Sequence, residues 1–368
     1  MSQAILRCLF GGLIAAICLG CAPRGQLTTL PPGRSSADGA TVHEVLVATT
    51  RAETDNGQVY ANERGDETLF SRFLVSVPPA RELGSINWPT RTPNPETDFF
   101  VEKADRLTSA TAFDRSLDRS LRERPAAERN AVIFVHGYNT NFAEALYRFT
   151  QAHHDYRSAD IPILFSWGSS ASTVGYLYDR DSTLVARNAL VELLKTVHGS
   201  GARKIAVIAH SMGTFLLMEA LREIAISGDR SALSRISEVV LMSPDISVDV
   251  FESQARAIGD LPQPFVVILS EADRALRVSS QLSQQSNRLG TLEDPRRLSE
   301  FEITLVDITA LAEIRSLNHL GAIESAVQIE RIRALAAFSD FLDEDAQEAA
   351  GSHVVQTFNR TIEITLQP

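Results

Sequence analysis

Residues 204–221 read KIAVIAHSMGTFLLMEAL, and this stretch decides the fold. The run IAVIA is typical of a strand that is buried on both faces, and the residues from Thr214 onward carry apolar side chains at helical spacing. Ser211 lies where the two patterns meet. Small residues, Ala209 and Gly213, stand two positions before and after it, as a tight strand-to-helix turn requires. The pattern therefore predicts a nucleophile elbow.

An elbow of this kind places the serine hydroxyl at the carboxyl edge of a sheet and points the start of the helix at it. An oxyanion formed there would meet the Met212 backbone N–H and a favourable helix dipole. A serine hydroxyl is a poor nucleophile near neutral pH, so catalysis also needs a histidine base and a carboxylate, in the chain order Ser, acid, His. The alternative is an ordinary turn between a strand and a helix.

Candidates for the acid follow two later apolar runs. Residues 265–269 form a β-branched run that Glu271 and Asp273 follow directly. We predict Asp273 as the acid, because Glu271 lies very close to the end of the strand. Asp273 has an alternative role as the N-cap of a helix that starts near residue 274. Asp245, after the run VVLMS, is a rival for the same catalytic role.

The candidate base is His319. It lies in the loop DITALAEIRSLNHLGAI, after the strand expected at residues 301–306, and it follows Ser211 and Asp273 in the chain. This order and position match what a Ser–acid–His site requires.

The second half of an oxyanion hole is expected after an earlier strand, in AVIFVHGYNTNF at residues 131–142. His136 and Gly137 form a sharp turn that lets backbone N–H groups face the serine. We predict the Tyr138 N–H as the donor, with Asn139 as its neighbour. His136 is interpreted as shaping this turn and not as the base.

Several phrases together resemble a known family. They are VATTR, ERGDE, SRFLVSVPP, VHGYNTNFAEALYRF, ILFSWGSSASTVGYLYDRDS, IAHSMGTFLLMEAL, LMSPDISVDVF and SEADRALRVSSQL, and they run from about residue 43 to about residue 330. This stretch resembles the α/β-hydrolase superfamily and, more narrowly, the bacterial esterase/lipase-like family called domain of unknown function 900. The resemblance implies an α/β-hydrolase fold and the catalytic roles of Ser211, Asp273 and His319. The sequence departs from the family pattern at SWGS, residues 166–169, and at LNHLG, residues 317–321.

Length and composition fit one enzyme-sized domain. The chain has 368 residues, of which 44% are hydrophobic, enough for one large sheet with helices on both faces. Its formal net charge of −11 gives no electrostatic attraction to nucleic acid or to an anionic lipid surface. The sequence has no phosphate-binding glycine loop, dinucleotide fingerprint or metal-ligand cluster, so we expect no cofactor and no metal.

The cysteines indicate the compartment. Cys8, Cys18 and Cys21 all fall within the first 21 residues, so the domain that follows has no disulfide. Residues 9–20 are apolar and rich in glycine and alanine, as in the core of a signal peptide. The end of this run, LGC, resembles a lipobox in which Cys18 replaces the usual leucine. We therefore expect a lipid anchor on Cys21 at the bacterial cell envelope, facing the periplasm or on the outer membrane of a diderm; an uncleaved anchor or plain secretion are the alternatives.

Strand and helix patterns alternate along the rest of the chain, which favours a mostly parallel sheet with helices on both faces. Strands are expected at 43–49, 70–77, 99–107, 131–135 and 161–166, with the polar segment 55–67 as a loop or hairpin connection. The chain is expected to begin with a lipoprotein signal peptide at 1–20 and a flexible tether at 21–41. A single domain at 42–342 follows, with leading elements at 42–125 and a catalytic core at 126–342. The C-terminal tail at 343–368 ends in TIEITLQP, which is expected to be an edge strand or a loosely held segment.

Substrate contacts should come from loops on the same sheet edge as Ser211. Trp167, Tyr176 and Tyr178 are candidates for the wall of an acyl or aryl pocket, although packing under a loop would use the same residues. The sequence thus predicts a serine hydrolase, most plainly a carboxylesterase for small or medium acyl esters. A thioesterase, amidase or acyltransferase would use the same triad, and a catalytically idle binding scaffold is the alternative outside enzymes.

Overall fold

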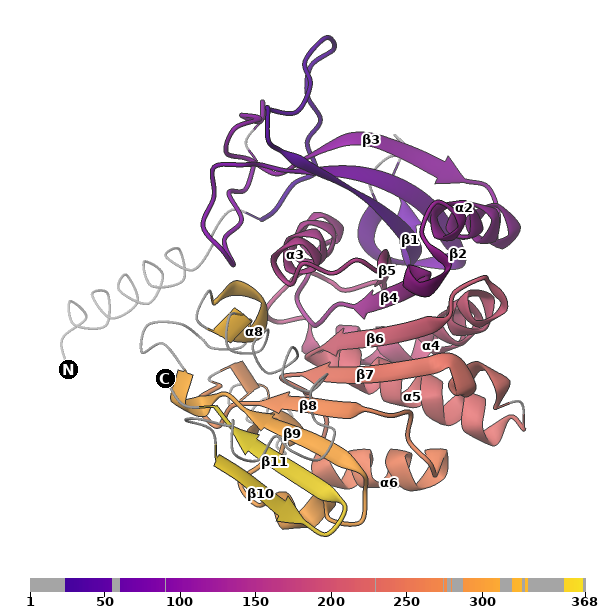
Figure 1. The fold of residues 1–368 in the computed structure, drawn as a ribbon, viewed down its shortest axis with the longest axis vertical. Coiled ribbons are helices and arrows are strands. Elements are labelled where there is room, and N and C mark those ends of the chain that lie inside the picture. The colour runs from indigo at the N-terminus through magenta and orange to yellow at the C-terminus, as the bar shows by residue number, and fades with distance from the viewer. Residues whose placement is uncertain are drawn as a thin grey trace, which may run out of the picture.

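The computed structural model describes residues 24–54, 60–89, 91–228, 230–273, 275–276, 279, 287–311, 320–325, 328–329 and 354–366. Its strands are β1 (Thr41–Glu53), β2 (Tyr60–Val77), β3 (Phe100–Leu107), β4 (Asn130–Val135), β5 (Ile161–Ser166), β6 (Lys204–His210), β7 (Ile236–Met242), β8 (Phe265–Leu269), β9 (Ile303–Asp307), β10 (Val354–Phe358) and β11 (Thr361–Thr365). Its described α-helices are α2 (Ala110–Arg122), α3 (Phe142–Asp155), α4 (Tyr176–Gly199), α5 (Met212–Ile226), α6 (Val248–Ile258) and α8 (Gly321–Glu324) (Figure 1).

All the described strands form one sheet, in the order β10-β11-β9-β8-β7-β6-β4-β5-β1-β2-β3. The neighbours from β11 to β1 pair in parallel, while β1 with β2, β2 with β3 and β10 with β11 pair antiparallel. The mostly parallel sheet predicted from the sequence is confirmed. The strand predicted at 161–166 has the same bounds as β5, and that at 265–269 the same bounds as β8.

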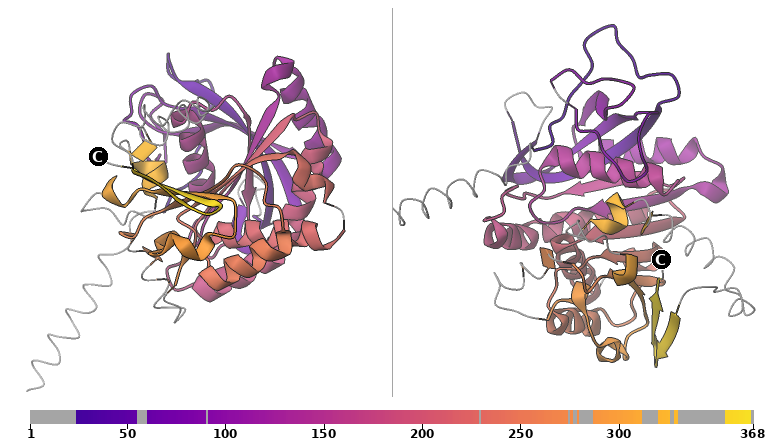
Figure 2. Two further views of the ribbon diagram at one scale, coloured as in Figure 1. Left: turned by 60° about the horizontal axis from the view of Figure 1, so that its bottom comes forward. Right: turned by 90° about the vertical axis from the view of Figure 1, so that its left-hand side faces the viewer.

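Helices cover both faces of the sheet (Figure 2). One hydrophobic core lies between the sheet and α2, α4, α5 and α6, and the other lies under α3 and α8. Every residue of β5 is buried, as expected for a strand with both faces covered. The carboxyl edge of the parallel strands is therefore the open side on which loops can build a site.

The β1–β2 hairpin is longer than the sequence predicts. Strand β2 begins at Tyr60, inside the polar segment expected as a connection, and the pairs Arg51 with Arg64 and Glu53 with Tyr60 extend the ladder. The polar side chains of this extension are tolerated because most of them lie at or near the surface of the antiparallel hairpin.

The sheet also continues past residue 342, where we expected the domain to end. Residues 354–365 form a hairpin, and β11 pairs in parallel with β9 along its whole length. Thr361 is fully buried, and its hydroxyl donates to the carbonyl oxygens of Leu298 and Phe301. The segment TIEIT is thus part of the sheet, and β10 is its outermost strand.

Part of the segment expected to be a flexible tether is held to the domain. The Asn141 side chain donates to the Gly25 carbonyl oxygen at 2.9 Å, and the Gly25 N–H donates to the Glu144 carboxylate at 3.1 Å. Further along, the Val101 N–H donates to the Thr28 carbonyl oxygen at 2.9 Å. Asn141 and Glu144 also form the capping box of α3, so two capping side chains fix the incoming chain. Residues 1–20 and Cys21 lie outside the described residues.

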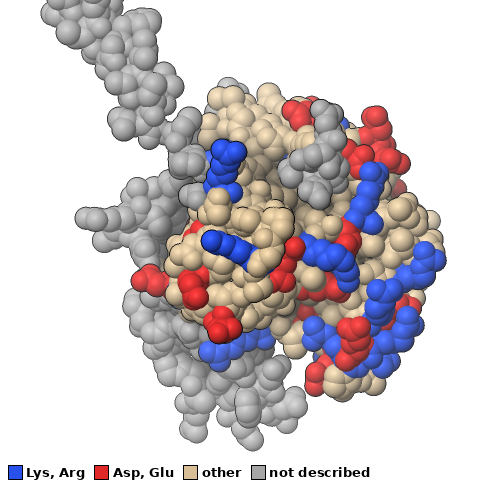
Figure 3. All heavy atoms as spheres, turned by 90° about the horizontal axis from the view of Figure 1, so that it is seen from above, with Lys and Arg blue, Asp and Glu red and all other residues tan. Residues whose placement is uncertain are grey.

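Charges are mixed on the face seen in Figure 3. On the outer strands of the sheet, Arg72 on β2 pairs with Glu44 on β1 and with Asp105 on β3. No helix among the described residues is both long and apolar enough to cross a membrane.

We predict that Asn141→Ala lowers the free energy of unfolding by about 1–2 kcal/mol, because it removes an N-cap and the bond to Gly25. Urea unfolding measures this loss, and limited proteolysis should cut residues 24–40 faster in the variant. The control is Asn188→Ala, at an exposed position of α4. Equal stability and equal cleavage in the two variants would show that Asn141 does not hold this segment.

Candidate active site

The predicted strand–turn–helix around Ser211 is confirmed. Strand β6 ends at His210, α5 begins at Met212, and Ser211 between them has φ 53° and ψ −124°. A residue with a side chain rarely adopts positive φ, and such strain is concentrated at functional sites. The Ser211 N–H donates to the Met242 carbonyl oxygen at 3.0 Å, which ties the turn to the end of β7.

Glycines allow the turn to pack closely against the loop after β4. A Cβ on Gly213 would lie 2.3 Å from the His136 carbonyl oxygen, so no larger residue fits there without a backbone shift. A Cβ on Gly137 would lie 2.8 Å from the Ser211 Cβ. The loop predicted to supply the second oxyanion donor is therefore in direct contact with the serine.

Among the described residues, two backbone N–H groups of that loop donate hydrogen bonds within the protein, and one does not. The Asn139 N–H donates to the Asp179 carboxylate at 3.1 Å, and the Thr140 N–H donates to the Ser169 hydroxyl at 3.1 Å. Within the part of the chain that the structure describes, the amides of Tyr138 and Met212 donate to no other group. These are the two amides that the sequence indicates for an oxyanion hole.

Asp179, on the first turn of α4, holds the loop from one side. Its carboxylate is fully buried and accepts hydrogen bonds from the Ser169 hydroxyl and the Ser170 N–H, both at 2.6 Å, besides the one from Asn139. A buried carboxylate requires such partners to offset its lost hydration. Asp179 thereby joins the loop after β4 to the loop after β5.

Arg51, at the buried end of the VATTR segment, holds the same loop. Its guanidinium donates to the Thr140 carbonyl oxygen at 2.8 Å and to the Ser166 hydroxyl at 2.8 Å, and it lies 3.3 Å from His136 Nε2. Burial lowers the pKa of Arg51 to about 9, so the group remains charged near neutral pH. Sequence reasoning missed Arg51 and Asp179. The available signal for Arg51 was a charged residue inside an otherwise apolar strand pattern, two threonines after the run VLVA.

His136 is part of this support. Its Nδ1 donates to the Gly137 carbonyl oxygen at 2.8 Å, and its Nε2 accepts from the Trp167 N–H at 3.1 Å. Burial and the nearby Arg51 charge lower the pKa of His136 to about 3, so the ring is neutral near pH 7. This arrangement fits the expected role of His136 in shaping the turn.

The three aromatic residues expected near a substrate lie in different environments. Trp167 is fully buried, stacks on His136 with ring centroids 5.0 Å apart and donates from Nε1 to the His136 carbonyl oxygen, so it has no surface to offer a substrate. The Tyr176 hydroxyl donates to the Asp245 carboxylate at 3.1 Å. Tyr178 is partly exposed, and the Arg64 guanidinium lies 4.1 Å from its ring centroid.

The two acid candidates differ in their partners. The Asp245 carboxylate lies 3.3 Å from Arg288 Nε in a buried ion pair, although the Asp245 N–H also donates to the Ser211 carbonyl oxygen at 3.3 Å. Asp273 is fully buried, and its carboxylate accepts from the Leu276 N–H at 3.0 Å, which is the expected helix-capping contact. His319 lies outside the described residues.

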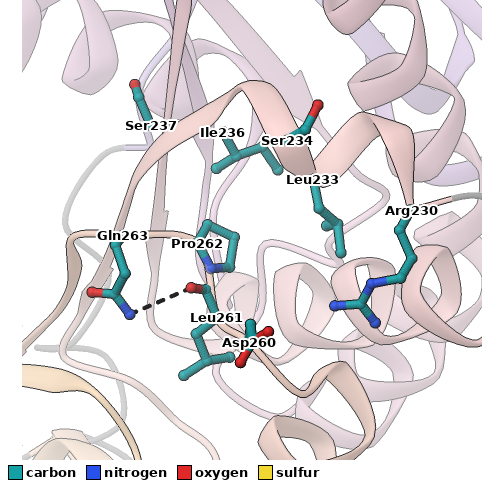
Figure 4. A pocket seen from close by; sticks show the side chains of 9 residues that line it. All are labelled: Arg230, Leu233, Ser234, Ile236, Ser237, Asp260, Leu261, Pro262 and Gln263. Atoms are coloured by element: carbon teal, nitrogen blue, oxygen red, sulfur yellow. Dashed lines mark hydrogen bonds between the residues drawn. The ribbon is translucent and has the colours of Figure 1, made fainter. Parts of the chain in front are cut away.

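A pocket opens at the opposite edge of the sheet, before β7 and β8 (Figure 4). Figure 4 shows one hydrogen bond among its lining residues, from Gln263 Nε2 to the Leu261 carbonyl oxygen. It shares no residue with the surroundings of Ser211. Nowhere in the described ranges do three His, Cys, Asp or Glu side chains gather as metal ligands.

We predict that Asp179→Asn loosens the loop after β4, because an amide cannot accept all three hydrogen bonds with one oxygen. Hydrogen–deuterium exchange of a peptide covering residues 136–141 should become at least tenfold faster. Asp181→Asn, on the exposed side of the same helix, should leave this exchange unchanged. Unchanged exchange in Asp179→Asn would contradict the role assigned to the carboxylate.

Comparison with known proteins agrees with this architecture. Among curated proteins no match was found. A family model described as an alpha/beta hydrolase of unknown function, DUF900, matches residues 88–335, which includes Ser211, the loop after β4 and both acid candidates. The chain therefore belongs to the DUF900 family of alpha/beta hydrolases.

Proposed function

We propose that the protein is a serine hydrolase, specifically a carboxylesterase for small or medium acyl esters, with Ser211 as its nucleophile. The observation that carries this proposal is the positive φ of Ser211 between β6 and α5. Positive φ at a non-glycine residue is uncommon and is enriched at active sites. It also occurs at five other described residues, so its value here comes from its place at the turn between β6 and α5. Membership of a hydrolase family supports the proposal at the level of the reaction class.

In the proposed mechanism, His319 takes the proton of the Ser211 hydroxyl as the oxygen attacks the ester carbonyl carbon. The tetrahedral oxyanion accepts hydrogen bonds from the Met212 and Tyr138 amides. His319 then gives the proton to the leaving alcohol, which leaves an acyl-enzyme on Ser211. Water hydrolyses the acyl-enzyme by the same route, while Asp273 orients His319 and stabilises its charged form.

The choice of Asp273 over Asp245 rests on the partners of Asp245 and on the position of Asp273 in the chain. Orienting a histidine would require the Asp245 carboxylate to share the oxygens that already face Arg288 and Tyr176. Asp273 follows β8, the second strand beyond β6 in the sheet, and precedes His319 in the chain. We keep Asp245 as the rival to be tested.

We also propose that Cys21 carries a lipid that anchors the protein at the bacterial cell envelope. The lipobox-like sequence that ends at Cys21 supports this anchor.

We predict that Ser211→Ala lowers kcat for p-nitrophenyl butyrate by a factor of about a thousand or more, because the nucleophile is lost. Asp273→Asn should cause a loss of similar size by leaving the histidine unoriented. Asp245→Asn should lower kcat by less than about tenfold, and it serves as the matched control. Thermal melts of all three variants verify folding.

Two results would change the assignment. Equal activity in folded Ser211→Ala would rule out Ser211 as the nucleophile. A larger loss of kcat in Asp245→Asn than in Asp273→Asn would transfer the role of the acid to Asp245.

A further inference from the structure

Exposed apolar side chains are concentrated on α4 and in the loop just before it. Among the described residues, nine large apolar side chains are exposed, and five of these fall between residues 174 and 185. Val174 and Leu177 are 91% and 75% exposed, and Leu184 and Val185 are 46% and 58% exposed. We call these four residues the α4 apolar face.

The spacing of these residues places them close together. Leu177 lies about two helical turns before Leu184 and Val185, so these three side chains share the exposed side of α4 with Asp181, and Val174 lies in the loop just before the helix. The opposite side of α4, with Tyr176, is buried in the domain. Single exposed apolar residues are ordinary, whereas a grouped set of them on one element marks a binding surface.

The α4 apolar face begins beside the candidate oxyanion loop. The Tyr138 hydroxyl donates to the carbonyl oxygen of Thr173 at 2.6 Å, directly before Val174. At the border of the face, Arg64 lies over the ring of Tyr178. An aromatic ring with a cation beside an apolar surface is typical of residues at the level of lipid headgroups.

The start of the described chain lies at the same loop. Arg24 donates to the Asn139 side chain at 3.0 Å and to the Asn139 carbonyl oxygen at 2.9 Å. Cys21 is three residues earlier, and three residues span at most about 11 Å. A lipid on Cys21 would therefore hold the loop around Tyr138 and Asn139, and the α4 apolar face beside it, close to a bilayer.

We propose that the α4 apolar face is a membrane-contact surface, which holds the carboxyl edge of the sheet against a lipid bilayer. Because the chain has a net charge of −11, the contact is apolar and does not depend on anionic lipid. If the proposed hydrolase activity holds, the substrates are acyl esters that reach Ser211 from the bilayer.

The test uses the chain from residue 22 onward, which keeps every described residue but has no lipid, and vesicles of phosphatidylcholine. Wild type should co-sediment with the vesicles. Leu177→Ser with Val185→Ser should weaken partitioning about a hundredfold, since each buried aliphatic side chain contributes about tenfold or more. Ile226→Ser, which changes an exposed apolar residue at the end of α5, is the matched control and should bind like wild type.

Three results would overturn the proposal: no binding by wild type, an equal loss in the Ile226→Ser control, or a dimer in light scattering that the double variant abolishes. The last result would assign the face to a second copy of the chain.

The substrate class is tested separately, because the double variant should lose activity on a vesicle-embedded ester and keep it on soluble p-nitrophenyl butyrate. If wild type cleaves neither ester, the hydrolase proposal fails, while the binding result still decides the membrane contact.

Discussion

The backbone of Ser211 is the constraint on which the rest of the site depends. Its positive φ costs about 1–3 kcal/mol and persists because neighbouring groups enforce it. The Ser211 N–H is bound to the Met242 carbonyl oxygen, and its carbonyl oxygen accepts from the N–H and the hydroxyl of Thr214. Gly213 then allows α5 to start against the end of β4. The packing of three parallel strands thus determines where the hydroxyl lies.

A second constraint comes from two buried charges of opposite sign. Arg51 binds the Thr140 carbonyl oxygen and Asp179 binds the Asn139 N–H, so the loop that faces Ser211 is held at two adjacent residues. Buried charges contribute little net stability, but hydrogen bonds to a loop fix its geometry. An oxyanion hole acts through donors whose positions are set before the reaction. The hydrogen bonds from Arg51 and Asp179 fix the loop that carries one of these donors.

Local patterns were sufficient for much of the fold. The buried run of β5 and the small residues around Ser211 identify their elements because neighbouring residues in sequence determine them. The contact of Arg51 with Ser169 joins residues 118 positions apart, and that of Asp179 with Asn139 joins residues 40 positions apart. Local periodicity in the sequence cannot predict such contacts. The same limit applies to residues 24–40, whose composition suggests a flexible linker but whose backbone is bonded to Asn141 and Glu144. The burial of Trp167 likewise follows from its stacking on His136 and not from its own loop.

The most direct test of the central claim is labelling of the protein with a fluorophosphonate, followed by mass spectrometry of the modified peptide. If the strained turn presents an activated serine, the phosphonate is found on Ser211, and labelling is lost in His319→Ala while that variant remains folded. A well-folded wild type that takes up no label, or that carries it on another serine, would contradict the account.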